Sequence, residues 1–260
     1  MIYLSLGAGV QSTALLILSA KGLHGCPKAD VAIFADTQDE PRWVYDYIET
    51  LRAWSPIPIE VVTAGKLSEA GEKFLRIPAF TACSDGSASL LRRQCTNEYK
   101  LVPLQRRVRE HLGLRPRQRA GDKKAVALIG ISLDEAHRMK PSRVPYILNT
   151  YPLVDAGIKR DKCLEIIAAE GLPMPRKSAC VFCPYHDNNY WRDLRDNHPE
   201  EFSVAVAYDK RIRDSTRAGV RLPAFLHRNL VPLDEVDLSD PYKDQLNFNF
   251  GNECEGMCGV

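Results

Sequence analysis

The sequence has no apolar run near the roughly 18 residues that suggest a membrane span. Its first residues also lack a basic stretch leading into an apolar one. We therefore expect no membrane partner, no secretory signal and a cytoplasmic protein. Disulfides are rare in a reducing compartment, so the eight cysteines are not expected to form a disulfide framework. Metal binding, catalysis or burial remain as their roles.

The composition excludes a disordered or fibrous protein, because 45% of the residues are hydrophobic and 26% are charged. A chain of 260 residues is long enough for one large domain, or for one domain with a small appendage. The formal net charge of +2 by itself indicates no class of partner, although the charges are unevenly distributed.

Short β-prone runs alternate with helical segments along much of the chain. We expect strands at 2–6, 31–35, 58–62 and 125–131, and helices at 11–20, 41–53, 159–170 and 186–217. In the last helix, inward positions are expected at Trp191, Leu194, Phe202 and Val206. This alternation predicts an α/β fold with a doubly wound, mostly parallel sheet covered on both faces.

A glycine-rich turn separates the first expected strand from the first helix. Its residues are Gly7, Ala8, Gly9, Val10, Gln11, Ser12 and Thr13. Such a turn exposes backbone N–H groups at a helix N-terminus, where the helix dipole favours phosphate. The turn matches neither G-x-G-x-x-G nor the Walker sequence. The alternative interpretation is a small-residue turn that only allows a strand and a helix to pack closely.

This turn resembles the loop of the adenine nucleotide alpha-hydrolase (PP-loop) superfamily, Ser-Gly-Gly-x-Asp-Ser-Thr. The segment from Phe34 through Asp36 and Thr37 to Glu40 resembles that family's Val-Asp-Thr-Gly-x-Glu. The resemblance implies a Rossmann-like PP-loop fold in which the turn binds the phosphates of ATP, with Mg²⁺, and adenine lies against the second strand. Gln11 stands where the family has Asp, and its amide brings no negative charge to a cation.

Cys180-Val-Phe-Cys183 is a C-x-x-C pair, which can bind zinc, ligate an iron–sulfur cluster or act as a redox dithiol. The third thiol is Cys95, in a segment that resembles the Cys-Cys-x-x-x-Lys-x-x-Pro-Leu stretch of the phosphoadenosine phosphosulfate reductase-like branch. Three thiols are similar to those of the iron–sulfur-dependent tRNA thiolases, which implies a 4Fe–4S cluster on Cys95, Cys180 and Cys183. The alternative is zinc on the pair, with Cys95 simply buried.

The segment from Gly130 to Arg138 resembles the family's Gly-x-Arg-x-x-Glu-Ser-x-x-Arg, which adds Gly130 to the expected nucleotide site. Ser132 replaces the first Arg of that pattern. A hydroxyl suits a phosphosulfate less well than a bidentate guanidinium does, so this change argues against a sulfonucleotide reductase. Lys100 and Arg138 are the candidates to neutralise charge on a transferring phosphoryl group.

The last residues carry Cys254 and Cys258, and Glu253-Cys254 resembles the Glu-Cys-Gly tail of sulfonucleotide reductases. Such a dithiol can attack a substrate sulfur, accept a persulfide or supply a cluster ligand, or it can be adventitious. The other thiols, Cys26, Cys83 and Cys163, have no motif around them and are expected to be packing residues.

Residues 92–124 carry eleven Lys or Arg against three acids. They can form a positive rim for a nucleic-acid substrate, with Arg138, Lys140 and Arg143 beside it. The alternative is a solvated helix face with a loop.

The leading hypothesis is an ATP-dependent iron–sulfur sulfurtransferase. It would adenylate and then thiolate a substrate, a nucleobase in nucleic acid, with an external sulfur or electron donor. The alternatives are a sulfonucleotide reductase using Cys254 and a non-catalytic nucleotide sensor with a structural metal. The nucleotide-binding domain would span 1–185 and a helical extension with its tail 186–260.

Overall fold

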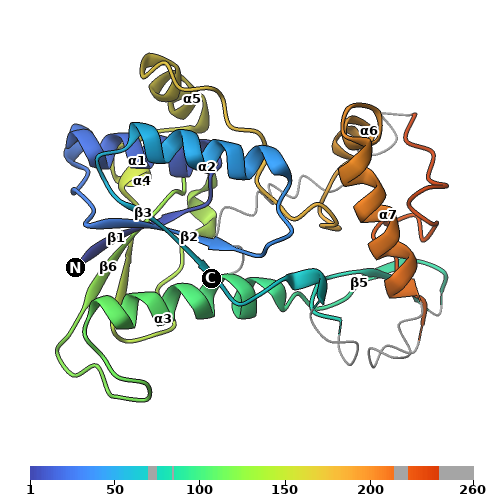
Figure 1. Ribbon diagram of the computed structural model, residues 1–260, viewed down its shortest axis with the longest axis horizontal. Helices are drawn as coiled ribbons and strands as arrows, with labels where there is room; N and C mark the ends of the chain where they lie inside the picture. Colours follow the sequence, from blue (N-terminus) through green and yellow to red (C-terminus); the bar gives the residue numbers. More distant parts are fainter. Residues whose placement is uncertain (70–74, 84, 214–221, 240–260) are drawn as a thin grey trace.

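The computed structural model describes residues 1–69, 75–83, 85–213 and 222–239. Five parallel strands form a central sheet in the order β3-β2-β1-β6-β7. These strands are β1 (Ile2–Leu6), β2 (Val31–Asp36), β3 (Ile59–Thr63), β6 (Ala125–Ile129) and β7 (Ile147–Thr150). Helices lie on both faces of the sheet (Figure 1). The expected α/β fold with a parallel sheet is thus confirmed.

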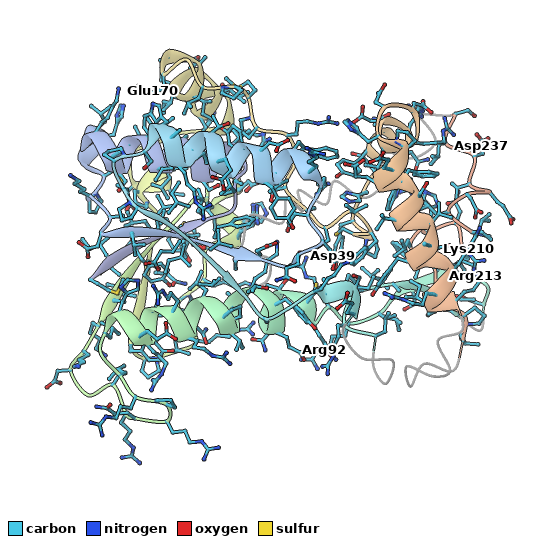
Figure 2. All side chains as sticks on the ribbon, viewed as in Figure 1. Asp39, Arg92, Glu170, Lys210, Arg213 and Asp237 are labelled. Atoms are coloured by element: carbon cyan, nitrogen blue, oxygen red, sulfur yellow. The ribbon has the colours of Figure 1, made fainter. Side chains whose placement is uncertain are left out.

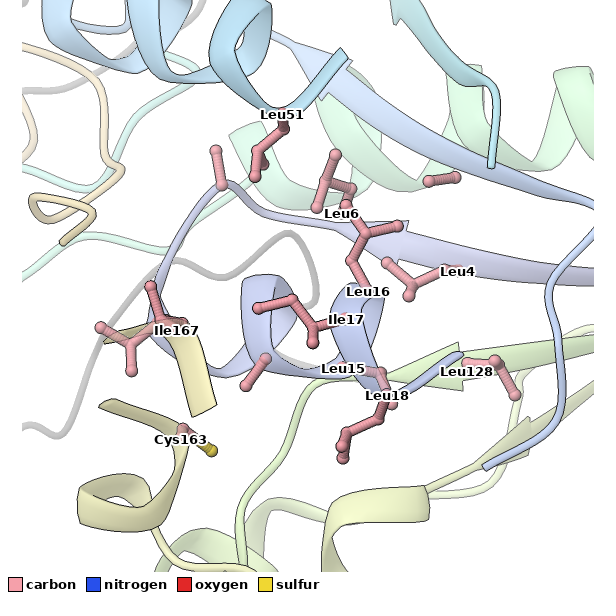
Figure 3. Close-up of a cluster of buried hydrophobic side chains, with 14 of the residues drawn as sticks. Leu4, Leu6, Leu15, Leu16, Ile17, Leu18, Leu51, Leu128, Cys163 and Ile167 are labelled. Atoms are coloured by element: carbon pink, nitrogen blue, oxygen red, sulfur yellow. The ribbon is translucent and has the colours of Figure 1, made fainter. Parts of the chain in front are cut away.

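The two faces of the sheet bury different sides of the same strands, as the two-residue period of a strand requires. Leu4 and Leu6 of β1 belong to one core, whereas Tyr3 belongs to the other. The first core is completed by helices α1 (Val10–Lys21), α2 (Arg42–Trp54), α4 (Pro152–Asp155) and α5 (Arg160–Ala169). Figure 3 shows its leucine-rich centre. On the other face lies α3 (Val102–His111).

Several elements differ from the expectation. Strand β7 and the antiparallel hairpin of β4 (Phe80–Ala82) and β5 (Ala88–Leu90) were not predicted. Short helical turns, also unpredicted, lie at η1 (Leu23–Gly25), η2 (Leu67–Glu69), η3 (Thr96–Leu101) and η4 (Leu133–Arg138). The single helix expected at 186–217 is two helices, α6 (Asn188–Asn197) and α7 (Pro199–Arg213). The break falls at His198 because a following proline disfavours helical geometry.

A second hydrophobic core lies between α6, α7 and residues from three other segments, at 67–79, 181–182 and 224–238. Trp191 and Leu194 are fully buried in it, and Phe202 and Val206 pack against it. All four inward positions are therefore confirmed. Leu67 and Phe182 also belong to this core, so it takes residues from both sides of the proposed boundary at 185, which stays a prediction.

The thiols without a motif divide into two kinds. Cys26 and Cys163 are buried in the first core, as expected. Cys83 is exposed, because it lies at the turn of the β4–β5 hairpin, where its N–H donates to Ser87 O. Among the described helices, none is long and apolar enough to cross a membrane.

Candidate functional site

The strand order places a topological switch point between β1 and β6, since the chain runs outward to β2 and β3 on one side and to β7 on the other. In open parallel sheets, ligands bind at this point, beyond the carboxyl ends of the strands. The loop at Gly7 to Gly9 follows β1 there, and Gly130 to Ser132 follow β6. The two sequence motifs expected to bind a nucleotide thus meet at one edge.

The loop after β1 is held in a tight turn that opens helix α1. Ala8 has a φ of 56°, in the left-handed region that favours glycine. Gly9 is the N-cap, and the Ser12 hydroxyl bonds its backbone N–H and C=O at 3.2 Å each. Gln11, Ser12 and Thr13 are buried. The helix N-terminus itself, rather than these side chains, is therefore the surface offered to a phosphate.

Gly130 allows β6 to approach this loop closely. A Cβ at Gly130 would lie 2.8 Å from Ser12 N and 2.9 Å from Ser12 Cα. Both are backbone atoms of α1, which cannot turn aside as a flexible side chain can. The glycine is required by packing at the site and not by an unusual backbone angle.

We therefore expect Gly130→Ala to push the start of α1 away from β6. The free energy of unfolding should fall by about 1–3 kcal/mol, the usual effect of overpacking, and the affinity for a nucleotide should fall with it. Urea unfolding and calorimetric titration with ATP measure the two effects. An unchanged unfolding midpoint together with unchanged ATP affinity would contradict the close approach.

Gln11 connects three elements of the site. Its Nε2 donates to Ser132 Oγ at 3.3 Å, and its Oε1 accepts from Arg160 Nη1 at 2.9 Å. Arg160 begins α5 and is 149 residues away in sequence. The Gln11 amide therefore links the Arg160 guanidinium to the Ser132 hydroxyl.

Cationic side chains surround the N-terminus of α1. Arg160, Arg176 and Lys177 line a small cavity there with Gly9 and Val10. The cavity is about 20 Å³, enough for a water molecule or one phosphate oxygen. A helix dipole and three cations at one point favour an anion.

Arg176 is held by an aromatic ring and by two polar side chains. Its guanidinium lies 4.1 Å from the centre of the Trp43 ring, and it also contacts Asp193 and His198. These contacts tie the α1 edge of the sheet to α6.

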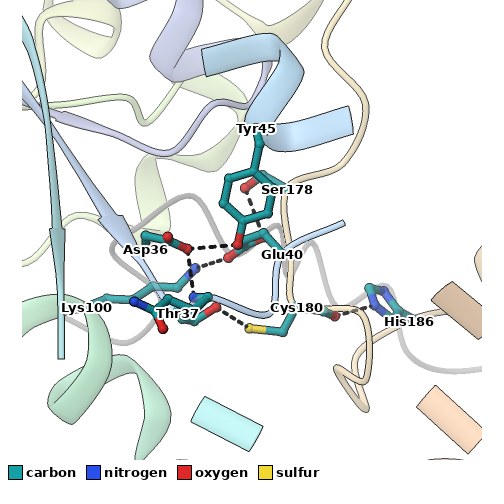
Figure 4. Close-up of polar contacts among 9 residues, drawn as sticks. Asp36, Thr37, Glu40, Tyr45, Lys100, Ser178, Cys180 and His186 are labelled. Carbon is teal, nitrogen blue, oxygen red and sulfur yellow. Dashed lines mark hydrogen bonds and ion pairs between the residues drawn. The ribbon is translucent and has the colours of Figure 1, made fainter. Parts of the chain in front are cut away.

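A buried polar network lies beside this edge, at the end of β2 (Figure 4). Asp36 accepts hydrogen bonds from Gln38 N at 2.7 Å and from the Tyr45 hydroxyl at 3.0 Å. Burial and the nearby Asp36 carboxylate raise the pKa of Tyr45. Thr37, directly after β2, is fully buried. Phe34 is also buried, but it lies inside β2, where it pairs with both neighbouring strands. Asp36 and Thr37 are thus at the strand end, and Phe34 is not.

Lys100 and Glu40 form an ion pair inside the protein. Lys100 Nζ lies 3.2 Å from Glu40 Oε1, and their side chains are 5% and 0% exposed. The Ser178 hydroxyl donates to Glu40 Oε2 at 3.4 Å. Lys100 was expected to neutralise a phosphoryl group, but its charge is already balanced by a carboxylate. Arg138 is likewise paired, with Glu135.

The C-x-x-C motif forms a tight turn directly against this network. Cys180 Sγ lies 3.1 Å from Thr37 Oγ1, and its carbonyl accepts hydrogen bonds from Cys183 N at 3.0 Å and from His186 Nε2 at 2.9 Å. Burial, and then the charge of Glu40, raise the pKa of Cys180 well above its ordinary value. Cys180 is therefore a protonated, hydrogen-bonded thiol in this arrangement.

The three thiols expected to ligate a cluster do not form a preassembled site. Cys95 and Cys180 both pack against the second core. Within the residues that the structure describes, however, no three His, Cys, Asp or Glu side chains are grouped so as to hold a metal ion. The 4Fe–4S cluster on Cys95, Cys180 and Cys183, and zinc as its alternative, stay predictions.

The basic stretch 92–124 is divided between the two ends of the sheet. The loop 112–124 connects α3 to the start of β6, so it lies at the amino edge of the strands, away from the site. Figure 2 shows its side chains at the far end from α6 and α7, with Arg92 nearer those helices. Arg109 and Lys123 donate to loop carbonyls. These cations stabilise their own loop, and only residues near 92–100 lie near the site.

Sequence reasoning missed the cations that surround α1. Arg160 opens an expected helix, and Arg176 and Lys177 stand shortly before the C-x-x-C motif. The closeness of Arg176 and Lys177 to the C-x-x-C motif in the sequence was the one available signal. A segment that leads to a motif at the edge of the sheet must pass close to that edge. Cys254 and Cys258, the tail candidates, lie outside the described residues.

Comparisons with known proteins include a distant structural likeness. No family model and no curated protein sequence matches the chain. Among solved structures, it is similar to phosphoadenylyl-sulfate (PAPS) reductase from Candida auris in a phosphate complex, with 14% identity and a TM-score of 0.41. The match covers 67% of this chain and 74% of that one. The fold is established by the strand order itself, and a likeness this distant is no guide to activity.

Proposed function

We propose that this protein is an ATP-dependent enzyme that adenylates an acceptor oxygen so that sulfur can replace it. The observation that carries the proposal is the α1 N-terminus at the switch point, lined by Arg160, Arg176 and Lys177. This arrangement suits the phosphates of a nucleotide. No carboxylate is among the described residues that line it, so Mg²⁺ would arrive bound to the phosphates of ATP.

In the first step, the acceptor oxygen attacks the α-phosphorus of ATP and pyrophosphate leaves. Negative charge develops on the phosphoryl oxygens, where the helix dipole, Arg160 and Lys177 can stabilise it. A sulfur nucleophile from the donor then attacks the activated carbon, and AMP leaves with the original oxygen. Cys183 and the tail thiols Cys254 and Cys258 are the candidate sulfur carriers, because the pKa of Cys180 is raised well above its ordinary value, which disfavours its thiolate. No step requires a cluster.

A second candidate, a sulfonucleotide reductase, is favoured by one observation. Gln11 holds Arg160 beside Ser132, so the guanidinium that the sequence pattern lacks is supplied from α5. In that reaction Cys254 would attack the sulfur of the phosphosulfate and release the nucleotide.

Parallel assays separate these activities. We expect the protein to bind ATP and to release pyrophosphate when total cellular RNA or pooled metabolites are given as acceptor. It should release AMP as well once sulfide is added as the sulfur donor. Sulfite release from phosphoadenosine phosphosulfate with a thiol reductant, lost in Cys254→Ser, would instead support the reductase. Nucleotide binding without turnover would support a sensor. Iron, sulfide and zinc contents after purification without oxygen test for a metal separately, with about four irons per chain indicating a 4Fe–4S cluster.

A further inference from the structure

A second, larger cleft lies beside the C-x-x-C motif and is not part of the α1 cavity. Its volume is about 720 Å³, within the roughly 300–1,000 Å³ of small-molecule sites. Four separate parts of the chain line it: the β4–β5 hairpin, Lys177, residues 184–188 and residues 226–229. No single segment of the sequence indicated it.

One side of the cleft is apolar and aromatic. Phe80, Leu90 and Leu226 contribute to it, and Tyr185 adds a half-buried ring. The guanidinium of Arg93 lies 5.0 Å from the centre of the Tyr185 ring, so one end of the basic stretch does reach this cleft. Aromatic faces of this kind stack on flat heterocycles.

Another side is built from ordered amides and an imidazole. His227 is 3% exposed, its Nδ1 accepts from Asn229 N at 3.2 Å, and its Nε2 lies 2.9 Å from Asn188 Oδ1. Because Nδ1 is an acceptor, the proton is on Nε2, which donates to Asn188. This hydrogen bond fixes the Asn188 side chain in the cleft wall. Amide groups can pair with the hydrogen-bonding edge of a base.

Two cations and one carboxylate, Asp187, also line the cleft, and one of the cations lines the α1 cavity as well. Arg228 and Lys177 both line the cleft, and Lys177 also lines the small cavity with Gly9. Lys177 Nζ donates to Tyr185 O at 3.4 Å and lies 5.7 Å from the centre of the Tyr190 ring. Lys177 is therefore shared by the cavity expected to bind the phosphates of ATP and by the cleft.

We infer that this cleft binds the acceptor as a nucleoside monophosphate unit. The base would lie between the aromatic side and the Asn188–His227 wall, and its phosphate would contact Arg228, with Lys177 facing ATP. This assignment rests on the proposed adenylation, since it places an acceptor next to the activating nucleotide. The same unit can come from a free mononucleotide or from an unpaired position in single-stranded RNA.

Two variants test the cleft without touching the α1 cavity. Ser89 is exposed on β5 and lines the cleft, so Ser89→Trp fills the space at little expected cost to folding. Arg228→Ala removes the proposed phosphate contact. Ala82→Trp is the matched control, because Ala82 is exposed on the same hairpin but does not line the cleft. Thermal unfolding checks that all three variants fold.

The measurement is calorimetric titration, in saturating non-hydrolysable ATP analogue, with AMP, GMP, CMP, UMP, inorganic phosphate and a single-stranded RNA ten-mer. We expect at least one nucleotide probe to bind, Ser89→Trp and Arg228→Ala to weaken it about tenfold or more, and Ala82→Trp to leave it unchanged. Binding of mononucleotides identifies a free acceptor, and binding of the RNA alone identifies a nucleic-acid one.

Three results overturn the assignment: no probe binds, phosphate alone binds, or both cleft variants bind like the parent protein. Separate titration of the ATP analogue keeps the two proposals distinct. If the analogue binds but the nucleotide probes do not, the proposed ATP site is kept and the assignment of the cleft is wrong. If the analogue does not bind, the probes are titrated without it. A nucleotide that binds the parent protein but not Ser89→Trp then supports the cleft as a nucleotide site and contradicts the ATP-dependent function.

Discussion

Replacing Glu40 by glutamine lowers the free energy of unfolding by about 3–5 kcal/mol, because it leaves the buried Lys100 ammonium without its carboxylate. The side chains of both residues are almost completely buried, and their charged atoms lie 3.2 Å apart. Urea unfolding followed by circular dichroism measures the change. The Glu40 network also contacts Ser178, two residues before Cys180, so the segment leading to the C-x-x-C motif should loosen as well.

Glu49→Gln is the control for Glu40→Gln. Glu49 pairs with Arg52 on the exposed side of α2 at 2.5 Å, and such surface pairs contribute about 0.2–1 kcal/mol. The double variant Glu40→Leu with Lys100→Met removes both charges and should recover much of the lost stability. A Glu40→Gln protein as stable as Glu49→Gln would contradict the importance of this ion pair.

Replacing Arg160 by alanine should weaken binding of ATP about tenfold to a hundredfold. A hydrogen bond to a charged group contributes about 1.5–3 kcal/mol, and each 1.4 kcal/mol is a factor of ten in affinity. Arg160→Lys should recover part of the affinity by restoring the charge without the forked guanidinium. Calorimetric titration with a non-hydrolysable ATP analogue measures the affinity, and raising the salt concentration should reduce the difference between the variants.

The matched control for Arg160 is Lys162→Ala on the same helix. Lys162 is exposed and pairs with Glu165 at 2.6 Å. The substitution Lys162→Ala removes the same charge from α5 as Arg160→Ala does. Gln11→Leu tests whether Gln11 positions Arg160, because it deletes the oxygen that accepts the hydrogen bond of the guanidinium. If Arg160→Ala and Lys162→Ala lower the affinity equally, the effect is one of net charge, and Arg160 does not contact the phosphates.

Much of the fold was predictable from local sequence because its signals are local. Buried strands such as 31–35 read as short apolar runs, and the helix at 41–53 is opened by Pro41. The β4–β5 hairpin was missed because its strands have three residues each, too few to show a period of two. The break between α6 and α7 had a visible signal in Pro199, which the long polar stretch concealed.

The sequence by itself determined the parallel α/β sheet, the glycine turn at the start of α1 and the C-x-x-C motif, since each depends on residues adjacent in the chain. Tertiary structure alone decided which charges meet. Lys100 reaches Glu40 across 60 residues, and Arg160 reaches Gln11 across 149. It also brought together the separate parts of the chain that form the cleft. Contacts of this kind depend on how the elements pack, and no local pattern of residues records them.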